Sequence, residues 1–237
     1  MGAVFVYPVP TRLAPIGLPK VLLSWSSGKD SAWALHMLRQ KGEVQVVGLL
    51  TTVNEVFERV AMHAVRTELL REQAEAVGLP LWQVQIPYPC SNEEYERVMR
   101  QAMEYAGREA VTAVAFGDLF LEDVRRYREE QMRGSGLEPI FPLWGLPTAE
   151  LSRSMVAAGL KAHLTCVDPK QIAAAFAGRA YDDDLLNELP PSADPCGERG
   201  EFHTFAHDGP MFSRPVSVRV GEVVERDGFV FADMLPA

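Results

Sequence analysis

Short apolar runs alternate along this chain with longer segments whose apolar residues have helical spacing. The apolar runs are rich in Leu and β-branched residues and have the length of buried strands; they lie at 21–23, 44–51, 81–86, 111–116 and 139–143. The segments between them have the spacing of helices, at 31–40, 63–77, 92–110 and 122–133. Ser91 and Glu94 have the spacing of a capping box at the start of 92–110. This order of strands and helices predicts a parallel sheet covered on both faces.

The pattern changes after about residue 137, where the segment EPIFPLWGLPTAEL is rich in proline and aromatic residues. The segments that follow have the patterns of a helix at 148–158, a strand at 161–167, helical stretches at 172–176 and 183–189, and a strand-rich tail through Phe231. We therefore expect an α/β protein with an N-terminal arm at 1–19, a parallel-sheet domain at 20–137 and a smaller α+β domain at 138–237.

A loop rich in Ser follows the first buried strand and reads SWSSGKDS at 24–31. Such a strand-to-helix turn places several backbone N–H groups and one lysine, Lys29, where a phosphate can bind. The loop is no Walker A motif, because Leu23 stands where that motif needs Gly and Asp30 where it needs Ser or Thr. An ordinary turn, with Asp30 or Ser31 as the N-cap of the helix, is the alternative interpretation.

Two further polar pairs, Thr51–Thr52 and Gly117–Asp118, fall at the ends of predicted strands. Ligands of parallel sheets bind in the crevice beyond the carboxyl ends of the strands. Because SWSSGKDS occupies a third strand end, the sequence predicts one nucleotide site built from all three. A plain turn is the alternative for Gly117–Asp118.

Three arginines follow on the predicted helix at 122–133, at positions 125, 126 and 128. They could meet an acidic substrate. However, Arg125 with Glu129 and Arg126 with Glu130 have the i,i+4 spacing of ion pairs on a solvated helix face. This second interpretation is favoured.

A second informative stretch, DPCGERGEFHTFAHDGPMF, lies at 194–212. Its central residues alternate as in a strand, which puts Glu201 and His203 on one face and Phe202 and Thr204 on the other. A Glu and a His side by side can serve acid–base chemistry or bind an amine. An edge hairpin with a solvated polar face is the alternative, and the spacing of the Cys and His residues matches no zinc pattern.

Composition limits the class of protein. The 237 residues are 47% hydrophobic and 23% charged, which is typical of a globular protein with a sizeable core. A net charge of −9 argues against an extended nucleic-acid interface. No apolar run reaches about 18 residues and the first residues lack the pattern of a signal peptide, so neither a membrane span nor secretion is expected. Three widely spaced cysteines favour a reducing, cytoplasmic compartment.

The loop and the tail resemble motifs of a known family. SWSSGKDS resembles the SGGxDS loop of the ATP pyrophosphatase (adenine nucleotide alpha hydrolase) superfamily, with Ser27 in place of a Gly; a serine is compatible there if its φ stays negative. SWSSGKDS, FGDL before an Arg-rich helix, FPLW and DPCGExGEFHTFxxDGPMF occur in this order in the diphthine–ammonia ligase family. The resemblance covers nearly everything from residue 20 onward. The chain departs from the family pattern at Arg199, where Asn is usual. Its sequence resembles the bacterial-type relatives of the family.

The resemblance implies a HUP/Rossmann-like nucleotide-binding domain and an ATP-dependent amide ligase. In that family a carboxylate attacks the α-phosphorus of ATP, pyrophosphate leaves, and ammonia displaces AMP. The loop would then act through Lys29 on the pyrophosphate, Asp30 on Mg²⁺ and Ser31 as the helix cap. The ATP-binding residues implied are Ser24, Ser26, Ser27, Gly28, Lys29, Asp30, Ser31, Thr51, Gly117 and Asp118. The catalytic residues implied are Lys29, Asp30, Glu198, Glu201 and His203, the last three for the ammonia step.

The partners implied are ATP, Mg²⁺, ammonium and a carboxylate substrate, which is diphthine-bearing elongation factor 2 or a small metabolite. Bacteria do not make diphthamide, so a bacterial member would keep the reaction and change the substrate. Free ammonium is the expected nitrogen donor, since the chain lacks an N-terminal cysteine for an amidotransferase step. The oligomeric state stays open, a homo-oligomer included.

Two other classes share the nucleotide loop. A tRNA-modifying adenylating enzyme would carry a basic surface and paired cysteines, and this acidic chain shows neither pattern. A non-catalytic ATP-binding or sensing module would not need Lys and Asp in the loop, or the polar tail motif. These features rank the ligase first.

Overall fold

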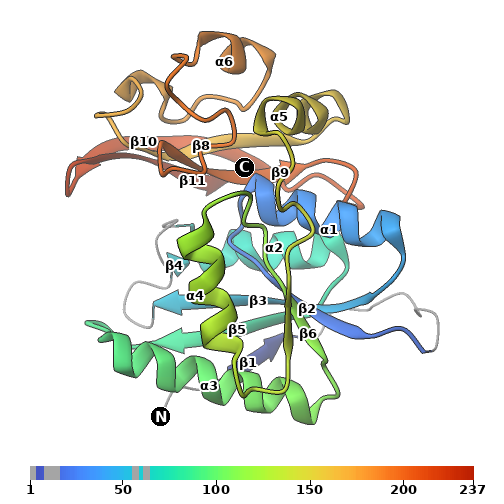
Figure 1. The fold of residues 1–237 in the computed structure, drawn as a ribbon. Helices are drawn as coiled ribbons and strands as arrows, with labels where there is room; N and C mark the ends of the chain where they lie inside the picture. Colours follow the sequence, from blue (N-terminus) through green and yellow to red (C-terminus); the bar gives the residue numbers. More distant parts are fainter. Residues whose placement is uncertain (1–3, 8–16, 55–58, 61–64) are drawn as a thin grey trace.

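The structure is a computed structural model that describes residues 4–7, 17–54, 59–60 and 65–237. Two sheets lie one above the other with helices between and around them (Figure 1). Among the described residues, no helix is both long and apolar enough to cross a membrane.

The first sheet has seven strands in the order β1-β5-β3-β2-β6-β7, with β4 paired to β3. The five strands from β5 to β7 along this order run parallel, while β1 and β4 pair antiparallel at the margins. The strands are β1 Val4–Tyr7, β2 Lys20–Ser24, β3 Gln45–Asn54, β4 Arg59–Val60, β5 Leu81–Ile86, β6 Ala113–Ala115 and β7 Glu138–Ile140. The parallel sheet expected from the alternating pattern is therefore confirmed.

Helices cover both faces of this sheet. They are α1 Lys29–Lys41, α2 Thr67–Val77, α3 Asn92–Arg108 and α4 Glu122–Met132. α1 and α2 lie on the face toward the second sheet, and α3 lies along the opposite face (Figure 1). Leu35 and Leu70 belong to the larger apolar core on the first side, whereas Val98 packs in the core under α3. The hydroxyl of Ser91 accepts from the Glu94 N–H at 3.2 Å, as expected of the N-cap of α3.

The second sheet is antiparallel, with the strand order β10-β11-β8-β9. Its elements and the helices beside it are α5 Thr148–Ala157, β8 Lys161–Val167, the 3₁₀ turn η1 Ala174–Phe176, α6 Asp183–Glu188, β9 Phe202–Asp208, β10 Val218–Arg226 and β11 Phe229–Pro236. β9 is an edge strand of this sheet, and it contacts α1, a helix that covers the first sheet (Figure 1). The second half of the chain thus reaches the loop at 24–31.

The observed elements differ in small ways from those expected from the sequence. The N-terminal arm contains β1, which pairs with β5. The helix expected at 63–77 begins at Thr67, and residues 63–64 lie outside the described part. β7 follows the expected domain boundary at 137 yet pairs with β6, so we propose that the first domain runs to about residue 140.

Candidate active site

The loop at 24–31 lies where three parallel strands end, as predicted. The Trp25 N–H donates to the Leu50 carbonyl at 2.7 Å, and the Thr51 hydroxyl donates to the Trp25 carbonyl. Gly117, after β6, packs on the first turn of α1, where a Cβ atom would lie 3.1 Å from the carbonyl carbon of Asp30. Only glycine allows this approach without displacing backbone. The structure therefore brings Thr51 and Gly117 to the loop.

The start of α1 differs from the expectation. α1 begins at Lys29 and its N-cap is Gly28, so Ser31 is not the cap and neither is Asp30. The Ser31 hydroxyl instead donates back to the Gly28 carbonyl at 3.0 Å. The Lys29 N–H, one of the free donors at a helix start, donates to the hydroxyl of Thr204 at 3.0 Å. A residue of β9, 175 positions away, thus provides the cap that Ser31 was expected to form.

Ser27 has φ of +70°, which corrects the expectation of a negative φ at this position. The left-handed conformation costs a non-glycine residue about 1–2 kcal/mol. The surroundings hold it in place: the Ser27 carbonyl accepts from the Ala206 N–H and from the Gln73 side chain, both at 2.9 Å. Gln73 also accepts from the Trp25 indole at 2.9 Å, so this α2 residue joins the loop to β9. No motif in the sequence pointed to Gln73.

Lys29 is buried behind the loop. Its ammonium donates to both Asp30 carboxylate oxygens, at 2.9 and 2.8 Å, and to the carbonyl of Cys196. It also lies 5.4 Å from the ring centroid of Tyr181 and 5.5 Å from that of Phe202. Burial lowers the pKa of Lys29, but Asp30, Cys196 and Glu198 together raise it by more, so the net pKa is raised and the ammonium stays charged. Lys29 therefore joins the loop to the tail motif.

The tail loop is held in shape by two buried carboxylates. Glu201 is 1% exposed, and its two oxygens accept from the N–H groups of Asp194 at 2.7 Å and Arg199 at 2.9 Å. Asp194 accepts from the N–H groups of Cys196 at 3.2 Å and Glu198 at 3.0 Å. Asp194 was missed in the sequence, although it opens the DPCGE motif. Both carboxylates are thus occupied with loop backbone.

Glu198 reaches from this tail loop to the loop after β6. Its carboxylate accepts from the Leu119 N–H at 2.8 Å and from the Phe120 N–H at 3.4 Å. Burial raises the pKa of Glu198 to about 7, and the nearby carboxylates of Asp30 and Asp118 contribute to the rise. A carboxyl group with a pKa near neutrality can accept or release a proton under ordinary conditions.

His203 and Cys196 lie in the same region. Burial lowers the pKa of His203 to about 4, with a further contribution from the Lys29 charge, so the imidazole is neutral near pH 7. Burial raises the pKa of the Cys196 thiol to about 12, which leaves it protonated and unreactive. Among the described residues, no group of three His, Cys, Asp or Glu side chains could hold a metal ion.

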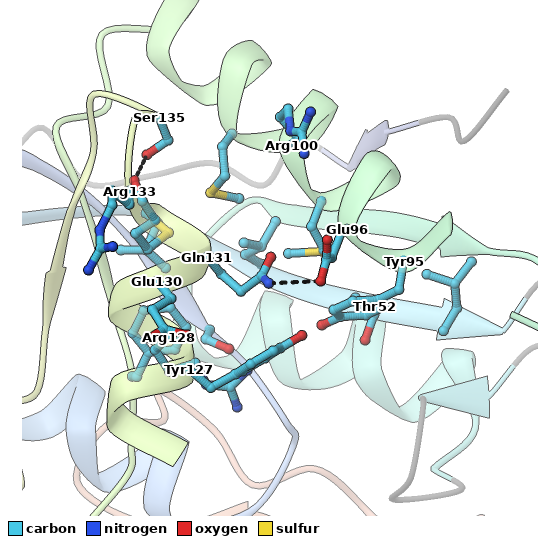
Figure 2. Close-up of a pocket in the computed structure, with 18 of the residues that line it drawn as sticks. Thr52, Tyr95, Glu96, Arg100, Tyr127, Arg128, Glu130, Gln131, Arg133 and Ser135 are labelled. Atoms are coloured by element: carbon cyan, nitrogen blue, oxygen red, sulfur yellow. Dashed lines mark hydrogen bonds between the residues drawn. The ribbon is translucent and has the colours of Figure 1, made fainter. Parts of the chain in front are cut away.

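A cavity of about 830 Å³ opens beside the loop (Figure 2). Ser24, Ser26 and Thr51 from the strand ends line it, together with residues of α3 and α4. In Figure 2, Tyr95 of α3 and Tyr127 of α4 project toward each other across the cavity. Its size and mixed apolar and polar lining suit a small-molecule ligand.

The arginines of α4 divide between two environments. Arg125 pairs with Glu129 at 2.8 Å on the helix face, as expected. Arg128 differs from the expectation: it lines the cavity, and its Nε lies 3.5 Å from a carboxylate oxygen of Asp118. Burial raises the pKa of Asp118, although Arg128 opposes this effect.

Comparisons with known proteins agree with this arrangement of two units. Residues 19–139 match the family model described as the diphthamide synthase N-terminal domain, and residues 148–231 match that of the diphthamide synthase C-terminal domain. The chain is 26% identical over 238 residues to diphthine–ammonia ligase of Homo sapiens, covering 87% of this chain and 85% of the human protein. It is 30% identical over 182 residues to diphthine–ammonia ligase of Danio rerio, covering 67% of this chain and 68% of that protein.

Proposed function

This chain belongs to the diphthamide synthase family, and we propose that it is an ATP-dependent amide ligase. In the proposed reaction a carboxylate of the substrate attacks the α-phosphorus of ATP, and pyrophosphate leaves. Ammonia then attacks the acyl-adenylate carbon, AMP leaves, and an amide remains. The observation that carries the proposal is the loop at 24–31, which follows the central strand β2 beside a cavity and contains the buried Lys29 paired with Asp30.

ATP is proposed to lie across the strand ends. The cavity lined by Ser24, Ser26 and Thr51 would hold the adenosine, and the loop with Ser27, Gly28 and the start of α1 would face the phosphates. The charge of Lys29 behind the loop offsets that of the leaving pyrophosphate, which lowers the barrier to the first step.

Magnesium is expected to arrive with the triphosphate rather than to occupy a cage of protein ligands. Mg²⁺ commonly uses one or two carboxylates together with substrate phosphates and waters. Asp118 fits this role in charge and position, whereas both oxygens of Asp30 already accept from Lys29. When bound, the ion would neutralise charge on the phosphates.

The tail motif is proposed to serve the ammonia step. Glu198, with a pKa near 7, can take the proton that ammonium must lose before it attacks, and the neutral His203 can assist. Glu201 is proposed to position this loop rather than to touch substrate, because both of its oxygens accept from backbone. The unreactive Cys196 thiol supports free ammonium as the nitrogen donor.

The acceptor is proposed to be a carboxylate of the diphthine type. Several relatives carry the name diphthine–ammonia ligase, which supports diphthine on elongation factor 2, and a small metabolite carboxylate is the other candidate. Such a reaction belongs in the cytoplasm.

Product analysis of α-labelled ATP tests this proposal. The protein is incubated with ATP, Mg²⁺ and ammonium, with and without diphthine-bearing elongation factor 2, and in parallel with a metabolite extract. AMP and pyrophosphate that depend on the diphthine protein support the full proposal, and the same products with extract alone keep the reaction but change the substrate. ADP and phosphate would refute it.

A further inference from the structure

Arg128 is placed at the cavity in an incomplete ion pair. Its Nε lies 3.5 Å from Oδ2 of Asp118, which is too long for a good N–H···O hydrogen bond. Within the described part of the chain, these two buried atoms are among the few side-chain polar atoms that have no hydrogen-bond partner. Burying polar groups without hydrogen bonds is costly unless a further partner supplies those hydrogen bonds.

The guanidinium is nevertheless well supported. It lies over the ring of Phe116, 5.1 Å from the centroid, at the end of β6. The same cavity is lined by Arg128, Phe116 and the loop residues Ser24 and Ser26, so one ligand can contact both the loop and this arginine. The other arginines that line the cavity, Arg100 and Arg133, are exposed. Arg128 is the one placed beside the carboxyl end of a strand.

We propose that Arg128 binds the α-phosphate of the nucleotide, the phosphate that stays on AMP. This inference rests on the proposed function and names the residue that would hold the reacting phosphorus. A guanidinium stacked on an aromatic ring presents two parallel N–H donors, which match two oxygens of a phosphate. The oxygens of the α-phosphate would accept hydrogen bonds from Arg128. This would hold beside the loop the phosphorus atom that the substrate carboxylate attacks.

The contribution of a phosphate is isolated by comparing AMP with adenosine. Both affinities are measured by calorimetry without magnesium, on the wild type and on Arg128→Gln, Arg128→Lys and Arg125→Gln. In the wild type AMP should bind more tightly than adenosine. Arg128→Gln should reduce that preference by about tenfold or more, which is typical of a lost charged hydrogen bond. Arg128→Lys should keep part of it.

Arg125 supplies the matched control, because it lies three residues earlier on α4 and pairs with Glu129. Arg125→Gln should leave both affinities and their ratio unchanged. An unchanged affinity for adenosine in Arg128→Gln shows that the cavity is intact. If that affinity falls, the double variant with Asp118→Asn removes the unpaired carboxylate and repeats the comparison.

Several results would overturn the inference. Equal affinity of the wild type for AMP and adenosine, or an equal loss of both in Arg128→Gln and in the double variant, would leave Arg128 with a structural role. An unchanged preference for AMP, with a raised KM for the carboxylate substrate, would assign Arg128 to the other reactant. If the wild type binds neither AMP, adenosine nor ATP, the proposed function itself fails, and this inference with it.

Discussion

Glu198 should contribute to the pH dependence of the stability of this protein, and Glu198→Gln should remove that contribution. Its pKa is about 7 in the folded protein, against an ordinary value of 4.5. Below the ordinary value the carboxyl is protonated in both folded and unfolded chains. As the pH rises, the unfolded chain releases the proton first, so the free energy of unfolding falls. Above pH 7 the loss reaches at most about 3 kcal/mol.

Urea unfolding at about pH 5 and about pH 8 measures this loss. A glutamine keeps the oxygen that accepts from the Leu119 N–H, and it carries no charge at either pH. The stability of Glu198→Gln relative to the wild type should therefore be up to about 2.5 kcal/mol higher at about pH 8 than at about pH 5, because at the lower pH the unfolded chain has already begun to release the proton. Glu225→Gln, at an exposed carboxylate on β10, is the control and should show no such gain. If Glu198→Gln differs from the wild type by the same amount at both pH values, the carboxyl is not perturbed and the reasoning is wrong.

Three further predictions concern the loop at 24–31 and its contacts. Thr204→Val removes the acceptor of the Lys29 N–H and should cost about 1–3 kcal/mol in urea unfolding, whereas Thr204→Ser should cost much less; equal losses would exclude the hydroxyl as the cause. Lys29→Met leaves the Asp30 carboxylate without its partner and should cost about 3–5 kcal/mol, and adding Asp30→Asn should recover most of this. A double variant as unstable as the single one would contradict that account. Ser27→Gly should be more stable than Ser27→Ala by about 1 kcal/mol, because both lack the hydroxyl and only alanine keeps the strain at φ +70°; the reverse order of urea midpoints would disprove it.

Part of the candidate site was predictable from the sequence because it depends on topology. The carboxyl ends of parallel strands meet at one edge of a sheet, so the loop at 24–31, Thr51 and Gly117 were expected together and are found together. The tail motif signalled chemistry without its partners. Glu198 contacts the loop after β6, whereas Glu201, expected beside it in function, is occupied with backbone N–H groups.

Other parts of the site had no signal in the sequence, or one that favoured another interpretation. Gln73 lies in an ordinary amphipathic helix, yet it hydrogen-bonds the loop and β9. Arg128 has the local spacing of a solvated helix face, but α4 turns it toward Asp118. The positive φ of Ser27 could not be read from its residue type, because serine rarely adopts it and the contacts that hold it come from α2 and β9.

By itself, the sequence determined the order and type of the secondary-structure elements, the helix start at Ser91 and the position of the phosphate loop at a strand end. These features follow from short-range periodicity, capping and chain direction, which act over a few residues. Only the tertiary structure decided which groups Lys29, Glu201 and Arg128 contact. Thr204, the acceptor of the Lys29 N–H, is 175 residues away, and packing of β9 against α1 brings it there. The partners of Glu201 are close in sequence, but the fold of the tail loop, which no local pattern specifies, sets these contacts.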